Sequence, residues 1–261
     1  SKVSLGSRMD QVYIPKNRVG FDIGNYVVIK PLNLEIEGKN FEKSFFYGIK
    51  NIESLKLEVI QEVFRIVNKY VQNYENIIIT GSFLDEGFHF NDVDIIVLTE
   101  DKINFNIVGW DVKKKTGING HILVLSRNEL VRGLESDPLY QMMLSRCVAQ
   151  KRVIYKAKYI LNYKLLDLHL FKSKVLLDNF DILNGREKYN LVRNLIAIYL
   201  YLGKHKVTVN TLDKEIKKIF SLDVQEIKDN VLGKKDFIKK YKSIYDKSFN
   251  LILRGIENGS K

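Results

Sequence analysis

The chain has 261 residues, of which 45% are apolar and 28% are charged, a composition that excludes disorder over most of its length. Its 42 Lys and Arg residues against 31 Asp and Glu residues give a formal charge of +11. This excess favours polyanionic partners such as nucleic acids or nucleotides, although a lysine-rich proteome would produce the same excess. The only cysteine, Cys147, excludes an internal disulfide and a cysteine-based zinc cluster.

The sequence predicts a cytoplasmic protein without a membrane segment. A single cysteine fits a reducing compartment. The first residues, SKVSLGSRMDQ, lack the apolar core of a signal peptide, and the longest uninterrupted apolar run, Leu195–Leu202, is too short to span a bilayer.

Residues 1–50 are expected to form an N-terminal extension with short β-strands. Apolar pieces broken by proline and glycine predict strands at Val12–Ile14 and Tyr26–Ile29. Residues 51–70 are predicted to form a helix, because their apolar side chains recur at the spacing of one helical face. The members of this stripe are Ile60, Val63, Phe64, Val67 and Val71.

The stretch Ile77–Leu98 carries the residues with the clearest chemistry. Ile77–Ile79 is a β-branched run that ends before Gly81, which predicts a short buried strand. Gly81 lets the backbone approach a ligand without a Cβ in the way, and Ser82 adds a hydroxyl beside exposed amides. This turn is therefore predicted to bind phosphate oxygens.

Two carboxylates, Asp92 and Asp94, begin a second apolar strand that continues to Leu98. Successive side chains on a strand point to opposite faces, so Asp92 and Asp94 share one face. Like charges on an apolar strand need a positive partner, and hard oxygen ligands suit Mg²⁺ or Mn²⁺. We interpret both residues as metal ligands. The structural alternative is a surface loop with both carboxylates solvated at an edge.

This layout resembles the polymerase-beta-like nucleotidyltransferase superfamily, whose pattern is a strand, Gly-Ser, a loop, Asp-x-Asp and a strand. Gly81-Ser82 and Asp92-Val93-Asp94 fill those positions in order. The resemblance implies an α/β (α+β) catalytic domain with a mixed sheet and flanking helices. It also implies that Asp92 and Asp94 hold the metal while Gly81 and Ser82 hold the outer phosphates of an NTP.

The chain departs from the family pattern at one position. The family has a third carboxylate on a later strand, where it completes the metal site and helps to activate the acceptor hydroxyl. The matching strand here, Asn119–Ser126, has no acid, and His121 stands where the acid is expected. His121 and the upstream Asp111 are the two candidates for the third position. A shifted or substituted ligand and a site with weak or no catalysis both stay open.

The segment between the Asp-x-Asp strand and residue 158 completes the expected catalytic domain, residues 51–158. Thr99–Gly120 is polar and contains Lys113–Lys115, which we interpret as a solvated hairpin tip, with phosphate contact as the alternative. Arg127–Gln150 is predicted to be helical with a restart at Asp137-Pro138, and Arg152–Tyr155 to be a short strand.

Residues 159–261 are expected to form a helical C-terminal domain, because strand-like alternation nearly disappears there. Helices are predicted near Tyr163–Asn179, Gly185–Gly203 and Lys235–Ile256. Residues 204–261 contain 14 Lys and Arg against 8 Asp and Glu, which is +6 of the total +11. This charge suits a nucleic-acid backbone or a triphosphate, and solvated helix faces are the alternative.

The sequence therefore predicts a metal-dependent nucleotidyltransferase that moves an NMP from an NTP to an acceptor hydroxyl and releases pyrophosphate. An RNA end is the favoured acceptor, and a small molecule or a protein would use the same chemistry. One alternative is an inactive module of the same fold that binds nucleotide or nucleic acid. Another is a glycosyltransferase that uses Asp92 and Asp94 to bind a nucleotide sugar, although Gly81-Ser82 would have no role in it. The NTP and the oligomeric state are not readable from the sequence.

Overall fold

The computed structural model describes residues 3–4, 11–12 and 43–259, with gaps at 89, 102–103 and 156. Strands β1 (Val3–Ser4) and β2 (Gln11–Val12) pair antiparallel within a unit formed by residues 1–39. Residues 40–261 form a second unit. Of the two strands expected in the extension, Tyr26–Ile29 lies outside the described residues, as does Val12–Ile14 except for Val12.

A five-stranded mixed sheet organises the second unit, with the strand order β3, β7, β4, β5, β6. All neighbouring pairs are antiparallel except β5 and β6, which run parallel and are connected through helix α2. The strands are β3 (Phe45–Tyr47), β4 (Tyr74–Thr80), β5 (Asp92–Thr99), β6 (Asn119–Leu125) and β7 (Cys147–Ala149). The strands predicted around Ile77, Ile95 and Leu123 are confirmed.

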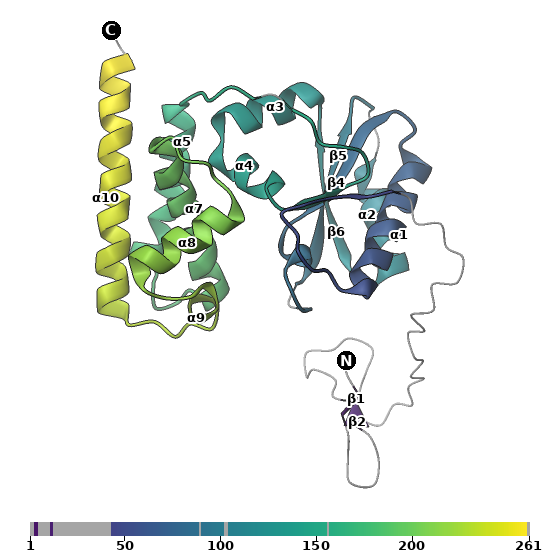
Figure 1. Cartoon of the computed structure of the whole chain (residues 1–261), viewed down its shortest axis with the longest axis horizontal. Helices are drawn as coiled ribbons and strands as arrows, with labels where there is room; N and C mark the ends of the chain where they lie inside the picture. Colours follow the sequence, from purple (N-terminus) through teal and green to yellow (C-terminus); the bar gives the residue numbers. More distant parts are fainter. Residues whose placement is uncertain are drawn as a thin grey trace. The chain divides into compact units, whose positions relative to one another are not determined.

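Helices cover both faces of the sheet, because β4 and β5 are apolar on both sides (Figure 1). Ile77, Ile79 and Ile95 pack against α1 (Ser54–Tyr70) and α2 (Phe105–Thr116). Ile78 and Ile96 pack in a separate cluster with side chains of α3 (Arg127–Ser136) and α4 (Pro138–Leu144). This double burial explains the uninterrupted apolar runs in the sequence.

Helix α2 corrects the prediction of a hairpin tip at Lys113–Lys115. The Asn104 side chain caps the first turn of the helix, and Gly117 ends it in the left-handed region with φ of 75°. Val108 and Val112, one helical turn apart, are fully buried against the sheet. The three lysines lie in the last turn, where positive charge interacts favourably with the helix dipole.

Strand β7 corrects a second prediction. The strand expected at Arg152–Tyr155 is absent there, and Cys147–Ala149, which was expected to continue a helix, is the strand. These three residues are fully buried and pair with β3 on one side and β4 on the other. Tertiary pairing therefore overrides the local pattern. Because β3 belongs to this sheet, the sheet also begins upstream of residue 51.

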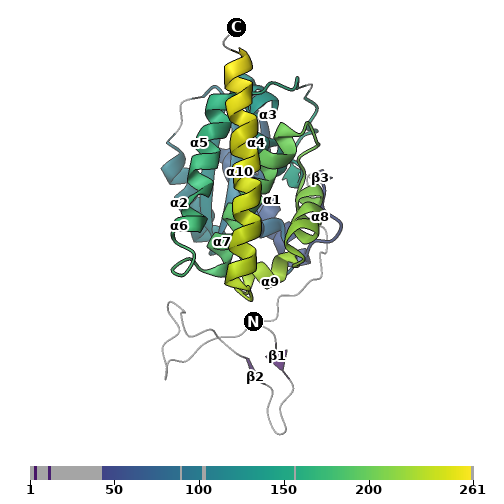
Figure 2. The same cartoon turned by 90° about the vertical axis from the view of Figure 1, so that its left-hand side faces the viewer.

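The residues after 159 are helical, as predicted, and they surround α7 (Gly185–Leu202), whose side chains dominate a separate apolar core. Figure 2 shows α10 in front of α7, between α5 and α8. The other helices are α5 (Tyr163–Ser173), α6 (Val175–Asp178), α8 (Val209–Phe220), α9 (Val224–Lys228) and α10 (Lys234–Gly259). None of the described helices has the length and apolar character needed to cross a membrane.

Tyr201 of α7 joins this helical core to α3. Its buried hydroxyl oxygen lies 2.6 Å from the carbonyl oxygen of Glu135 and 2.9 Å from that of Ile160, and the two acceptors share its single proton. We expect Tyr201→Phe to lower the free energy of unfolding by about 1–2 kcal/mol, because the Glu135 and Ile160 carbonyls lose the hydroxyl donor that the fully buried Tyr201 provides. Urea denaturation followed by circular dichroism measures the change.

The matched control is Tyr199→Phe. The half-buried Tyr199 hydroxyl has no hydrogen bond recorded among the described residues, so its loss should change stability by much less. Equal effects of the two substitutions would contradict the role assigned to the Tyr201 hydroxyl.

Candidate functional site

The sheet register brings the predicted site residues together at one end of three neighbouring strands, where β4 ends and β5 and β6 begin. Thr80 at the end of β4 pairs with Asp94 of β5, and Asp94 pairs in turn with His121 of β6. Gly81 follows Thr80 directly, and Asp92 lies two residues before Asp94 on the same face of β5. Three strands that are distant in sequence therefore assemble the glycine turn, the two carboxylates and the histidine side by side.

Gly81 is required by both backbone conformation and space. Its φ of 84° and ψ of −168° lie in a region that is almost restricted to glycine. A Cβ at this position would lie 2.0 Å from Asp94 Oδ2. The turn therefore closes directly onto the carboxylate. Ser82, which begins the short 3-10 helix η1 (Ser82–Leu84), is exposed and available to a ligand.

Asp94 contacts both neighbouring strands through different oxygens. Its Oδ2 faces Gly81, and its Oδ1 lies 3.0 Å from His121 Nδ1. The side chains of Asp94 and His121 are 37% and 73% exposed, so the pair is open to solvent. When Nδ1 carries the proton and donates to Asp94, the Nε2 lone pair of His121 is left free to accept a proton from another molecule.

The donor set suits a hard cation that keeps some ligands from solvent or substrate. Asp92 and Asp94 are half-buried and present carboxylate oxygens from one strand face. Mg²⁺ is commonly held by one or two carboxylates together with waters and substrate phosphates. Within the described part of the chain, no group of three His, Cys, Asp or Glu side chains gathers to hold a metal. The two carboxylates therefore fit a cation only if phosphate or water supplies the remaining ligands.

Asp111 does not join this site. It lies on α2 and accepts a hydrogen bond from the Tyr70 hydroxyl at 2.6 Å and one from Lys69 Nζ at 3.2 Å. Lys69 and Tyr70 are the last two residues of α1, which is followed by the start of β4. Thr80 and the predicted site residues lie at the other end of β4. The Tyr70 hydrogen bond, and after it Lys69, lower the pKa of Asp111. This carboxylate therefore has two structural partners of its own, and of the two candidates only His121 contacts Asp94.

Sequence reasoning missed Asp85, three residues after Ser82. Its carboxylate binds Arg146 Nη1 at 2.8 Å and Lys228 Nζ at 3.4 Å, and its backbone carbonyl accepts a hydrogen bond from Lys56. The sequence offers one signal: Lys56 lies four residues before Ile60 and so continues the apolar stripe of α1. The structure shows Lys56 fully buried there, and a buried lysine needs a partner. Nothing in the sequence identifies which acceptor that partner is.

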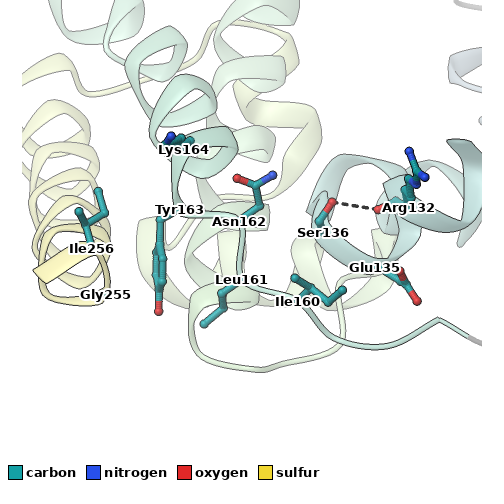
Figure 3. Close-up of a pocket in the computed structure, with 10 residues that line it drawn as sticks. All are labelled: Arg132, Glu135, Ser136, Ile160, Leu161, Asn162, Tyr163, Lys164, Gly255 and Ile256. Carbon is teal, nitrogen blue, oxygen red and sulfur yellow. Dashed lines mark hydrogen bonds between the residues drawn. The ribbon is translucent and has the colours of Figure 1, made fainter. Parts of the chain in front are cut away.

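The larger of two described cavities lies away from these residues. About 580 Å³ in volume, it lies between the end of α3, residues 160–164 and the last turns of α10 (Figure 3). The Tyr163 ring forms one wall and lies against Gly255, where a Cβ would be 2.2 Å from the ring. None of the predicted site residues lines this cavity.

The chain matches no protein-family model, and no curated protein sequence matches it significantly.

The close approach of Gly81 to Asp94 can be tested by substitution. We expect Gly81→Ala to destabilise the protein by about 2 kcal/mol or more, because alanine is strained at this φ and its methyl group collides with Asp94. Thermal unfolding measures this loss. The neighbouring Ser82→Ala should leave the unfolding temperature nearly unchanged because Ser82 is exposed, and a similar loss in both variants would refute the close approach at Gly81.

Asp111 generates a second prediction, about pH. Its pKa is lowered in the folded protein, so its contribution to stability is complete above the pKa of the unfolded chain and is lost as pH falls through the lower, folded value. Asp111→Asn should therefore lose less stability than the wild-type chain between pH 7 and about pH 3. Unfolding temperatures at both pH values test this, with the exposed Asp246→Asn as control. Parallel acid profiles of Asp111→Asn and wild type would contradict the assignment.

Proposed function

We propose that the chain is a metal-dependent nucleotidyltransferase that moves an NMP from an NTP to an acceptor hydroxyl and releases pyrophosphate. One observation supports the proposal most strongly. The strand register gathers Gly81-Ser82, Asp92, Asp94 and His121 at the same end of β4, β5 and β6. Strand, turn and carboxylates are in the order that the nucleotidyltransferase resemblance requires. The mixed sheet with helices on both faces is compatible with the same reading.

The Gly81-Ser82 turn would hold the outer phosphates. Without a Cβ, the backbone at Gly81 can approach phosphate oxygens closely, and the exposed Ser82 hydroxyl can donate to them. The turn lies directly against Asp94. Phosphates bound there would consequently lie beside the two carboxylates, which is where a triphosphate and a cation need to meet.

Asp92 and Asp94 would hold Mg²⁺ or Mn²⁺. When bound, such an ion neutralises the charge of the triphosphate and stabilises the charge that develops on the leaving pyrophosphate. The carboxylates themselves orient the site, because one strand face fixes both of them and Asp94 is restrained further by Gly81 and His121.

His121 would accept the proton of the acceptor hydroxyl. With Nδ1–H donated to Asp94, the imidazole is fixed in one tautomer and its Nε2 can take the proton. The hydroxyl oxygen then bonds to the α-phosphorus, the bond from that phosphorus to the bridging oxygen breaks, and pyrophosphate leaves with the electron pair. A histidine oriented by a carboxylate thus replaces the third carboxylate of the family pattern.

Charge favours an RNA end as the acceptor. Residues 204–261 carry +6 of the total +11, and most of these residues lie on helices α8, α9 and α10. Polyanions gain affinity from such a surface without any base-specific contact. A small molecule or a protein remains the acceptor class that the experiment below would reveal in place of RNA.

One observation favours a second function, a catalytically weak or inactive module that binds nucleotide or nucleic acid. The described residues contain no three-membered cluster of metal-ligating side chains, and one oxygen of Asp94 is already engaged by His121. A cation held by two carboxylates depends on the substrate for its remaining ligands. Binding without turnover would be the consequence.

A transfer assay tests the proposal. The protein is incubated with each labelled NTP, Mg²⁺ or Mn²⁺ and a total RNA pool. We expect label to appear on RNA and to disappear in the Asp92→Ala/Asp94→Ala double variant. His121→Gln should bind NTP like the wild type but transfer label about 10²–10⁴-fold more slowly, because only proton transfer is lost.

The matched control is Asp111→Asn, which removes a carboxylate bound by Tyr70 outside the predicted site and should keep full transfer. Label on the protein itself would identify a protein acceptor. NTP binding without transfer by the wild type would replace the transferase with the binding module. Release of nucleoside diphosphate from nucleotide sugars would instead support a glycosyltransferase.

A further inference from the structure

Three cations from three parts of the chain converge on Asp85, the residue that ends the turn begun by Gly81-Ser82. Asp85 is the C-cap of η1, and its N–H donates to the Ser82 carbonyl at 3.0 Å. Contacts that restrain Asp85 therefore also restrain Ser82, because this hydrogen bond and the short chain between the two residues link them. We call Asp85 and its three cationic partners, Lys56, Arg146 and Lys228, the turn brace.

Arg146 makes the strongest contacts of the turn brace. Its Nη1 donates to Asp85 Oδ1 at 2.8 Å, and its Nη2 donates to the Leu84 carbonyl at 2.7 Å. The planar guanidinium thus donates one hydrogen bond to a side chain of the turn and one to its backbone. Its own backbone is fixed as well, because the Arg146 carbonyl accepts a hydrogen bond from Thr80 Oγ1 at 3.2 Å and β7 begins at the next residue.

Lys56 of α1 also holds the turn. The fully buried ammonium donates to the Asp85 carbonyl and pairs with Glu53 Oε2 at 2.8 Å. Its Nζ also lies 5.5 to 5.9 Å from the ring centroids of three phenylalanines, Phe83 within the turn and Phe88 and Phe90 after it. Glu53 accepts a hydrogen bond from the Gly87 N–H. The start of α1 therefore fixes the chain on the far side of Asp85.

Lys228 is the looser member of the turn brace and comes from the helical region. It lies 3.4 Å from Asp85 Oδ2, and its Nζ stands 4.7 Å from the centroid of the Tyr189 ring. A contact of this length is weaker than the 2.8 Å contact of Arg146. The turn is consequently held mainly by Arg146 and by Lys56 of α1, and less tightly by Lys228 of α9.

We propose that Arg146, acting through Asp85, is the positioning residue that sets the Gly81-Ser82 turn for binding triphosphate, an inference that rests on the proposed function. The buried Phe83 and Leu84 anchor the middle of the turn in the core, whereas Ser82 is exposed. The hydrogen bonds of Arg146 to Asp85 and to the Leu84 carbonyl add a second restraint next to Ser82. Residues behind a binding group that restrict its orientation commonly change ligand affinity about 10–100-fold when they are removed. Arg146 has the position and the hydrogen bonds to act in this way.

Two measurements on the same variants test this inference. Hydrogen exchange reports whether the amides of residues 82–87 are held, and calorimetric titration with Mg²⁺–ATP, and with the other three NTPs, reports affinity. We expect Arg146→Gln to accelerate exchange in 82–87 and to weaken NTP binding about tenfold or more. Arg146→Lys, which keeps the charge but loses the fork, should restore part of the affinity.

The comparison variants separate positioning from general damage. Asp85→Asn should weaken NTP binding in the same direction as Arg146→Gln, and the loss in the double variant should be smaller than the sum of the two single losses, because both substitutions break the contact that the two residues share. Lys228→Gln should have a smaller effect, in line with its longer contact. Arg65→Gln, which breaks an exposed pair with Glu62 on α1, should change neither measurement.

The outcomes distinguish this inference from the proposed function. Unchanged exchange in 82–87 for Arg146→Gln, or faster exchange with unchanged NTP affinity, would overturn the positioning role. If the wild-type chain bound no NTP while exchange still accelerated in Arg146→Gln, the proposed function would fall and with it the nucleotide part of the inference. The mechanical hold of Arg146 on the turn would then stand alone.

Discussion

The contact between Gly81 and Asp94 is the constraint on which the site depends. An antiparallel pair places Thr80 opposite Asp94, and the missing Cβ of Gly81 lets the turn close onto the carboxylate. The parallel pair on the other side of β5 brings His121 to the same carboxylate. A shift of one residue in either pairing would turn the side chains to the opposite face, so the apolar packing of the sheet also fixes the polar site.

The local sequence was sufficient to predict most of the site and much of the fold. Ile77–Ile79 and the strand from Asp92 to Leu98 are apolar on both faces, and such runs have few other structures open to them. The glycine turn and the shared face of Asp92 and Asp94 follow from chain geometry alone. The sheet also brings His121 next to Asp94, while the role predicted for His121 stays a prediction.

What the sequence could not supply depends on contacts between distant residues. Cys147–Ala149 forms a strand because β3 and β4 offer it partners on both sides, although its local pattern favoured a helix. Helix α2 was missed because its last turn carries three lysines and its buried residues are only two valines, which give a weak helical pattern. The acceptor of a buried lysine such as Lys56 is likewise set by tertiary packing. Charge at the ends of elements thus misleads pattern reading most easily.

The strand order also has a consequence for biosynthesis. β7 lies between β3 and β4, yet about a hundred residues separate Cys147 from its partner Tyr47 in the chain. During translation, the side of β4 that pairs with β7 therefore has no strand partner until residues 147–149 have left the ribosome. A nascent chain that stops before Arg146 would expose an apolar strand edge, which is the kind of surface that recruits other chains. Arg146, which binds Asp85, directly precedes β7 in the chain, so the residue that holds the turn and the strand that completes the sheet leave the ribosome together.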